Sequence, residues 1–82
     1  MTVKRPLVMN QPQIGQLIRA IRLEVGMTQE QLAAELGVTY SSMNRWENGR
    51  RTPSPLAMRK IEELLRQMGD RGQELLEKHY AE

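Results

Sequence analysis

Residues 29–49 read QEQLAAELGVTYSSMNRWENG, and this stretch decides the fold. It holds two short helical patterns that are separated by residues 37–39, Gly-Val-Thr. The first pattern starts after Thr28, which opens the capping-box sequence Thr-Gln-Glu-Gln, and it stops at the glycine. The second pattern starts after Thr39, its N-cap, and reaches Asn48. The stretch therefore predicts two helices joined by a turn of three residues.

Two helices joined by a short turn that contains glycine form a helix-turn-helix, whose second helix can lie in the major groove of DNA. Ala33 is small at the point where the two helices would approach most closely. The apolar residues of the stretch can form a core shared by both helices; they are Leu32, Leu36, Val38, Met43 and Trp46. The composition of the stretch thus fits the packing of this motif.

The second predicted helix has two different faces when its residues are projected at about 100° each. Met43 and Trp46 point to one side. Four polar residues share nearly the opposite side: Ser41, Asn44, Arg45 and Asn48. These types can pair with base edges, arginine with guanine, asparagine with adenine and serine with either. A polar stripe alone is more often a solvated helix face, but the short turn, Ala33 and the basic loop Arg50-Arg51 together favour the DNA-binding interpretation.

Helical patterns continue on both sides of this motif. Before it, an apolar stripe with helical spacing runs up to Gly26 and consists of Ile14, Leu17, Ile18, Ile21 and Val25. After it, Ser54 can cap a helix that has Pro55 at its first position. The apolar stripe of that helix consists of Ala57, Ile61, Leu64, Leu65 and Met68, and residues 73–80 are compatible with a short fifth helix. Since strand patterns are nearly absent, we predict an all-α fold, a compact bundle of four or five helices.

The length of 82 residues allows one small domain. We expect residues 1–11 to be a flexible N-terminal arm, residues 12–68 to form the helix-turn-helix domain, and residues 69–82 to be a C-terminal helix or tail. A short terminal helix has little chain left to cover it, so this last segment holds the candidates for a dimer contact: Leu75, Leu76 and Tyr80.

The run from Gln29 to Gly49 resembles the DNA-binding domains of the phage repressor/Cro (XRE) family, and the similarity extends over about Ile14 to Leu65. The resemblance implies a bundle of the lambda-repressor-like type. It also implies a sequence-specific transcription regulator that binds double-stranded DNA, usually as a homodimer on pseudo-palindromic operators.

The resemblance also implies, position by position, which residues contact DNA. The base contacts would be Tyr40, Ser41, Asn44 and Arg45. The phosphate contacts would be Gln29, Ser42, Asn48, Arg50 and Arg51. Several family members have glutamine where this chain has Tyr40, and tyrosine cannot form the bidentate contact of glutamine with adenine. Tyr40 is therefore expected at a phosphate or a thymine methyl group.

The family pattern implies one structural ion pair as well. Glu47 is acidic within the presumed DNA face, and family members often neutralise this position with an arginine from the first helix. Arg22 occupies the matching place. We therefore expect an Arg22–Glu47 ion pair that orients the guanidinium toward the DNA backbone.

Composition excludes several other functions. The chain has no cysteine and one histidine, which excludes cysteine-based zinc sites and sites built from several histidines. No nucleophile–base pair or phosphate-binding loop is visible, so we predict no enzyme, no metal and no cofactor. No apolar run approaches the length that spans a membrane, so we expect a cytoplasmic protein. The net charge is only +2, but three arginines and one glutamate give residues 39–51 that same surplus.

Two alternatives stay open from the sequence. The protein could be the antitoxin of a toxin–antitoxin pair, which binds both its operator and a toxin protein. It could also be a protein-interaction module on the same fold.

Overall fold

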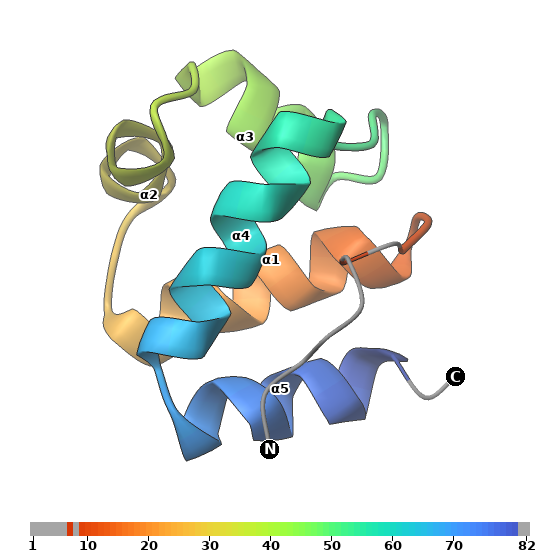
Figure 1. Ribbon diagram of the computed structural model, residues 1–82. Coiled ribbons are helices and arrows are strands. Elements are labelled where there is room, and N and C mark those ends of the chain that lie inside the picture. Colours follow the sequence, from red (N-terminus) through yellow and green to blue (C-terminus); the bar gives the residue numbers. More distant parts are fainter. Residues whose placement is uncertain (1–6, 8, 81–82) are drawn as a thin grey trace.

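The computed structural model describes residue 7 and residues 9–80 (Figure 1). These residues form five α-helices and no strand. The helices are α1 (Gln13–Val25), α2 (Gln29–Leu36), α3 (Tyr40–Glu47), α4 (Pro55–Gln67) and α5 (Asp70–Tyr80). The predicted all-α bundle is confirmed. In Figure 1, α5 packs along α1 at one end of the molecule, α2 and α3 lie at the other end, and α4 runs between the two ends.

The helices α2, α3 and α4 begin where the sequence supplies a hydroxyl cap. Thr28 accepts a hydrogen bond from the backbone N–H of Gln31 (3.1 Å), and the Gln31 side chain accepts one from the N–H of Thr28 (2.9 Å). This reciprocal pair is the capping box at the start of α2. Thr39 caps α3 and Ser54 caps α4 by the first of these two bonds alone, each accepting a backbone N–H at its side-chain oxygen. The helix starts expected from the sequence are therefore present.

The core is centred on α1. The side chains that are almost fully buried include four from this helix and three from its neighbours: Ile14, Leu17, Ile18, Ile21, Leu32, Met43 and Ile61. The stripe predicted on α1 ends one turn earlier than expected, because Val25 is 37% exposed next to the C-cap Gly26. Burial of the other apolar positions follows the predicted helical spacing.

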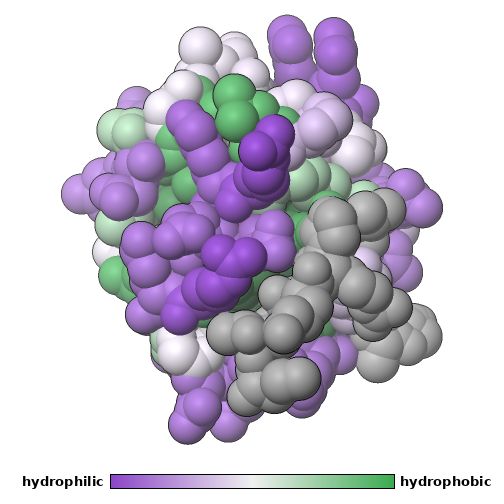
Figure 2. Space-filling view, in the orientation of Figure 1, coloured by the Kyte–Doolittle hydropathy of each residue, from purple (hydrophilic) through white to green (hydrophobic). Residues whose placement is uncertain are grey.

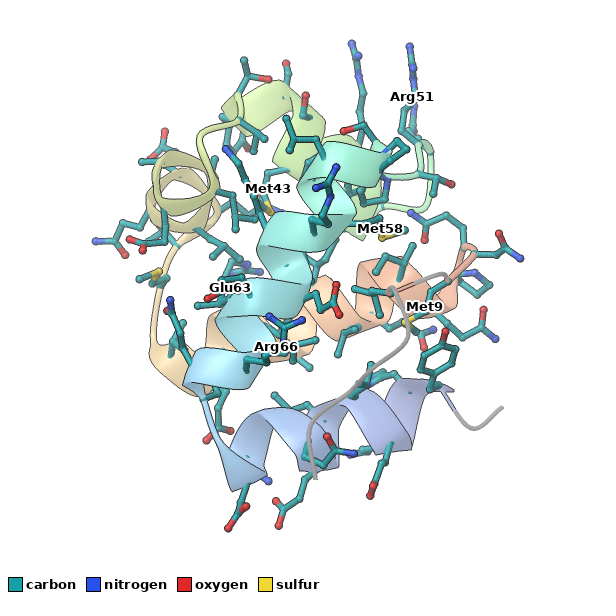
Figure 3. All side chains as sticks on the ribbon, in the orientation of Figure 1. Met9, Met43, Arg51, Met58, Glu63 and Arg66 are labelled. Atoms are coloured by element: carbon teal, nitrogen blue, oxygen red, sulfur yellow. The ribbon has the colours of Figure 1, made fainter. Side chains whose placement is uncertain are left out.

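The expectation of a flexible arm over residues 1–11 does not hold for its described end. Leu7 and Met9 are buried in the core, with exposed fractions of 5% and 6%. Figure 3 shows Met9 beside the start of α1, and it lines one groove together with Met58 of α4. Two apolar residues without helical spacing gave no periodic signal, so sequence reasoning missed them. Residues 1–6 and 8, the rest of this predicted arm, lie outside the described residues.

The C-terminal segment is a helix that completes the core. α5 begins at Asp70, three residues before the predicted start. Leu75 and Leu76 are 7% and 6% exposed, because they pack inside the same chain. Leu75 and Leu76 are therefore core residues and poor candidates for a dimer contact. Tyr80 is 43% exposed, and a dimer contact of this segment stays a prediction.

The five helices of the described residues are each too short or too polar to span a bilayer.

Candidate nucleic-acid interface

The two helices of the motif meet at the turn formed by residues 37–39. Gly37 has a φ angle of 72°, in the left-handed region where glycine carries no steric penalty from a Cβ atom. The N–H of the next residue, Val38, donates to the carbonyl oxygen of Ala33 at 2.9 Å and closes the turn. Ala33 is 2% exposed at the contact between α2 and α3, as its small size predicted. These local bonds fix the angle at which α3 leaves α2.

The turn and the buried side of α3 leave its polar side facing outward. Met43 and Trp46 lie in the core, with exposed fractions of 0% and 6%. Tyr40 is 50% exposed, and Ser41 and Arg45 are exposed as well. The first turn of α3 and the middle of its outer face thus form an accessible ridge of polar side chains.

The proposed phosphate contacts lie on both sides of this ridge. On the α2 side, a shallow hollow is lined by Arg22, Thr28, Gln29, Glu30 and Tyr40. On the α4 side, a groove is lined by residues that include Ser42, Arg45, Arg51 and Ser54. The ridge therefore lies between two polar hollows, each of which contains at least one arginine.

The basic loop after α3 extends the same face. Asn48, Arg50 and Arg51 are exposed. In Figure 3, Arg51 projects away from the body at the end of the molecule where α3 lies, and Figure 2 shows hydrophilic side chains reaching beyond that end. The side chains of this loop are therefore free to meet a partner that approaches α3.

Arg22 and Glu47 form a bidentate ion pair that joins α1 to α3. Nε of Arg22 lies 2.7 Å from one carboxylate oxygen of Glu47, and Nη2 lies 3.0 Å from the other. The Glu47 side chain is 1% exposed and the Arg22 side chain 14%. The hydrogen bonds to Glu47 raise the pKa of Arg22 above its ordinary value, and burial opposes this only in part. The acidic group is therefore neutralised inside the molecule and does not present a bare negative charge on the α3 face.

A chain of side-chain hydrogen bonds continues from Glu47 toward the surface, and no sequence pattern predicted it. Gln29 donates from Nε2 to a carboxylate oxygen of Glu47 (3.0 Å) and accepts at Oε1 from Nδ2 of Asn44 (3.2 Å). Asn44 in turn accepts at Oδ1 from Nδ2 of Asn48 (3.1 Å). We call this chain the amide relay; it consists of Glu47, Gln29, Asn44 and Asn48. It holds two of the proposed phosphate contacts and one proposed base contact in fixed orientations before any partner binds.

The amide relay leaves Asn44 with half of its hydrogen-bonding capacity. An asparagine amide has two N–H donors and two acceptor lone pairs. One donor is used on Gln29 and one lone pair on Asn48. One donor and one acceptor remain, which is the number that bidentate pairing with adenine requires.

The described residues contain no group of three or more histidine, cysteine or acidic side chains that could hold a metal ion. The face around α3 is a ridge with open polar hollows and basic side chains. Such a surface suits binding to a polyanion.

Comparison with known proteins places the chain in a family. The family model described as "Helix-turn-helix" matches residues 18–67, which include α2, the turn and α3. The chain therefore belongs to the helix-turn-helix family of the Cro/C1 (XRE) type, as the sequence resemblance indicated. This family consists of DNA-binding regulator domains.

One relative is an uncharacterized HTH-type transcriptional regulator of Methanothermobacter thermautotrophicus. It is 44% identical over 45 residues, which are 55% of this chain and 65% of the relative. The match thus spans slightly less than two thirds of the relative's length. No solved structure matches the chain significantly.

Proposed function

We propose that the protein is a sequence-specific DNA-binding transcription regulator that inserts α3 into the major groove. The observation that carries this proposal is the exposed polar ridge of α3, which is followed directly by the exposed arginines of the loop. Family membership and the regulator name of the relative support it. A regulator of this kind acts where the DNA is, so the proposal places the protein in the cytoplasm. Neither the family match nor the relative supports the alternative that the protein is an antitoxin.

Each part of the interface has a distinct role in this proposal. The outer face of α3, with Tyr40, Ser41, Asn44 and Arg45, contacts base edges. Gln29 contacts a phosphate at the start of α2, where backbone N–H groups and the positive end of the helix dipole favour an anion. Phosphates on the other side of the groove are contacted by Ser42, Asn48, Arg50 and Arg51. The Arg22–Glu47 pair keeps α1 and α3 in register beneath these contacts.

We further propose that two copies bind one operator. Helix-turn-helix dimers place their recognition helices in half-sites about 34 Å apart, one turn of B-DNA. The bound sequence should therefore be a pseudo-palindrome whose half-sites are about 10 base pairs apart, centre to centre.

Selection from a random double-stranded DNA library with the purified full chain tests this function. We expect enrichment of one motif with two-fold symmetry and the half-site spacing given above. Enrichment of a single asymmetric half-site would contradict binding as a dimer, but it would still agree with a DNA-binding transcription regulator. A folded protein that retains no DNA at low ionic strength would contradict the proposed function itself and favour a protein-interaction module.

A further inference from the structure

We propose that Gln11, which lies outside the helix-turn-helix, is a positioning residue for DNA binding: its side-chain amide holds the basic loop that carries Arg50 and Arg51. The inference rests on the proposed function. Gln11 precedes α1, and its partners lie 35 and 40 residues away in the chain.

The amide of Gln11 bonds to three backbone groups at once. Nε2 donates to the carbonyl oxygen of Trp46 (2.9 Å) and to that of Arg51 (2.6 Å). Oε1 accepts from the backbone N–H of Gly15 (3.1 Å). An amide has two N–H donors, so both are used on the two carbonyl groups. A single side chain thereby joins the start of α1, the end of α3 and the loop.

The backbone of the loop makes few other hydrogen bonds, although Pro53 near its end is buried. The N–H of Gly49 donates to the carbonyl of Trp46 (3.2 Å), and that of Arg50 donates to the carbonyl of Arg45 (2.8 Å). Beyond Arg50, the next cap is Ser54, at the start of α4. Within the described part of the chain, the bond from Gln11 is the one hydrogen bond made by residues 51–53. Gln11 therefore fixes the backbone at the residue from which Arg51 projects.

The surroundings of Gln11 are tightly packed. A Cβ atom on Gly15 would overlap the carbonyl oxygen of Trp46 and would lie 2.8 Å from Oε1 of Gln11. The first turn of α1 is thus in direct backbone contact with the last turn of α3. Because α1 and α3 are packed together here, the side chain of Gln11 can hold the backbone of the loop in one position relative to both helices.

The physical consequence concerns the entropy of binding. A loop that is ordered only on the DNA loses conformational freedom at that moment, and this loss weakens the complex. A loop that Gln11 has already ordered presents both guanidinium groups to the phosphates without that loss. The effect should be independent of sequence, because phosphate contacts carry no base information.

The substitution Gln11→Met tests this inference, because methionine has a similar length but cannot donate to the carbonyl groups. We expect affinity for DNA to fall about tenfold, the size that loss of one or two ordinary hydrogen bonds predicts. The fall should be the same for the selected operator and for an operator with one altered base. The slope of log affinity against log salt should stay that of the wild type, because both arginines still neutralise their phosphates once the loop is ordered on the DNA. NMR order parameters of the Arg51 and Thr52 amides should fall in the protein without DNA.

The matched control is Gln73→Met, the same change at the opposite end of the molecule. Gln73 lies on α5, where its amide donates to Glu77 (3.0 Å). This variant also loses one side-chain hydrogen bond, but we expect wild-type affinity and salt dependence from it.

A double-variant comparison separates positioning from a general structural role. In a chain that already carries Arg50→Ala and Arg51→Ala, the further change Gln11→Met should leave affinity unchanged, because no arginine remains to be positioned. A second tenfold loss in that background would overturn the proposal. Three results for the single variant Gln11→Met would also overturn the proposal. They are wild-type affinity together with wild-type loop order, altered discrimination between bases, and failure to fold. If the wild-type chain binds no DNA, the proposed function fails instead, and the loop order parameters still report on Gln11.

A second variant, Gln11→Glu, keeps the size of the side chain and makes its donor dependent on pH. The ionised carboxylate has no donor and faces two carbonyl oxygens, whereas the neutral acid can donate one O–H group. Its affinity relative to wild type at the same pH should therefore be lowest near pH 7. It should rise as the pH falls through the pKa of the new carboxyl. A ratio that stays constant with pH would contradict donation from this position.

Discussion

Arg45 and Arg50 carry the same charge on neighbouring parts of the interface, yet the proposal gives them different tasks. Arg45 lies on the outer face of α3, and Arg50 lies in the loop that follows. Arg45→Ala should cost about 1–3 kcal/mol of binding free energy and relax the preference at one base position. Arg50→Ala should weaken binding to all sequences similarly and reduce the salt slope by about one contact. Affinities measured on a set of single-base operator variants at several salt concentrations check both.

The contrast between the two variants is the informative result. If both changes lowered affinity equally for every sequence, the assignment of Arg45 to a base edge would be wrong. A control is Arg59→Ala, an exposed arginine on α4 that the proposal does not use, with no effect expected on base preference.

Glu47 makes the more buried half of the ion pair with Arg22, and its loss should destabilise the fold. Glu47→Ala leaves the mostly buried guanidinium without its carboxylate and removes the acceptor of Gln29. Breaking a buried pair on one side costs about 3–5 kcal/mol, a large share of the stability of a small domain. Urea unfolding followed by circular dichroism measures this loss.

The control for Glu47→Ala is Glu63→Ala on α4. The Glu63 side chain is 60% exposed and pairs with Arg66, whose side chain is 43% exposed. Exposed pairs contribute about 0–1 kcal/mol, so this variant should stay close to wild type. Equal losses from the two variants would show that the Arg22–Glu47 pair adds no more than a surface pair.

At the scale of the helices, local chemistry made the motif predictable. The caps Thr28, Thr39 and Ser54 act within three residues of themselves, so a single sequence shows them. Apolar spacing likewise identified the buried faces of α1, α3 and α4. The amide relay and Gln11 also include bonds between residues 15 to 40 positions apart, and no local pattern encodes such pairs. Of the long-range polar contacts that hold the interface, the family resemblance implied the Arg22–Glu47 pair, and the others were not predicted.

The packing of α5 on α4 depends on a glycine whose role was also invisible in the sequence. Gly72 lies inside α5, where alanine would ordinarily favour the helix by about 0.5–1 kcal/mol. A Cβ atom at this position would overlap the backbone carbonyl oxygen of Leu65, and it would lie 3.1 Å from Cβ of Met68. A backbone group cannot move aside like a flexible side chain. We expect Gly72→Ala to lower the free energy of unfolding by about 1–3 kcal/mol, measured by urea unfolding.

The sign of the change in unfolding free energy for Gly72→Ala shows whether close packing or helix propensity dominates at this position. Gln73→Ala, on the same helix and with its side chain bonded to Glu77 alone among the described residues, should change stability by less than about 0.5 kcal/mol. If Gly72→Ala stabilised the protein, helix propensity would dominate, and the close approach of α4 and α5 would not require glycine.

For the whole molecule, the positive charge is concentrated in one part of the chain. Residues 1–53 hold seven cationic and four anionic side chains, a net +3, whereas residues 54–82 hold five and six, a net −1. The face around α3 belongs to the first part, and α5 at the opposite end belongs to the second. Two of the seven cations, Lys4 and Arg5, lie outside the described residues. The surplus placed on α3 and its loop is three arginines against Glu47, and it orients the α3 end toward a polyanion during approach. The small overall charge therefore understates how well this face suits DNA.

The family match ends at residue 67, but the core of this chain does not. Leu75 and Leu76 of α5 are buried, and Arg71 at the start of α5 forms a bidentate pair with Glu24 of α1 at 3.0 Å. Burial of a leucine contributes about 1.5–3 kcal/mol, and a domain of this size has little stability to spare. A chain ending at residue 69 should therefore lose its cooperative thermal unfolding transition, and with it the affinity for DNA. A chain ending at Tyr80 is the control and should melt like the full chain. Native-like melting of the chain ending at residue 69 would instead show that α5 is an accessory to a complete domain, since α1 and α4 would then hold the helix-turn-helix together without it.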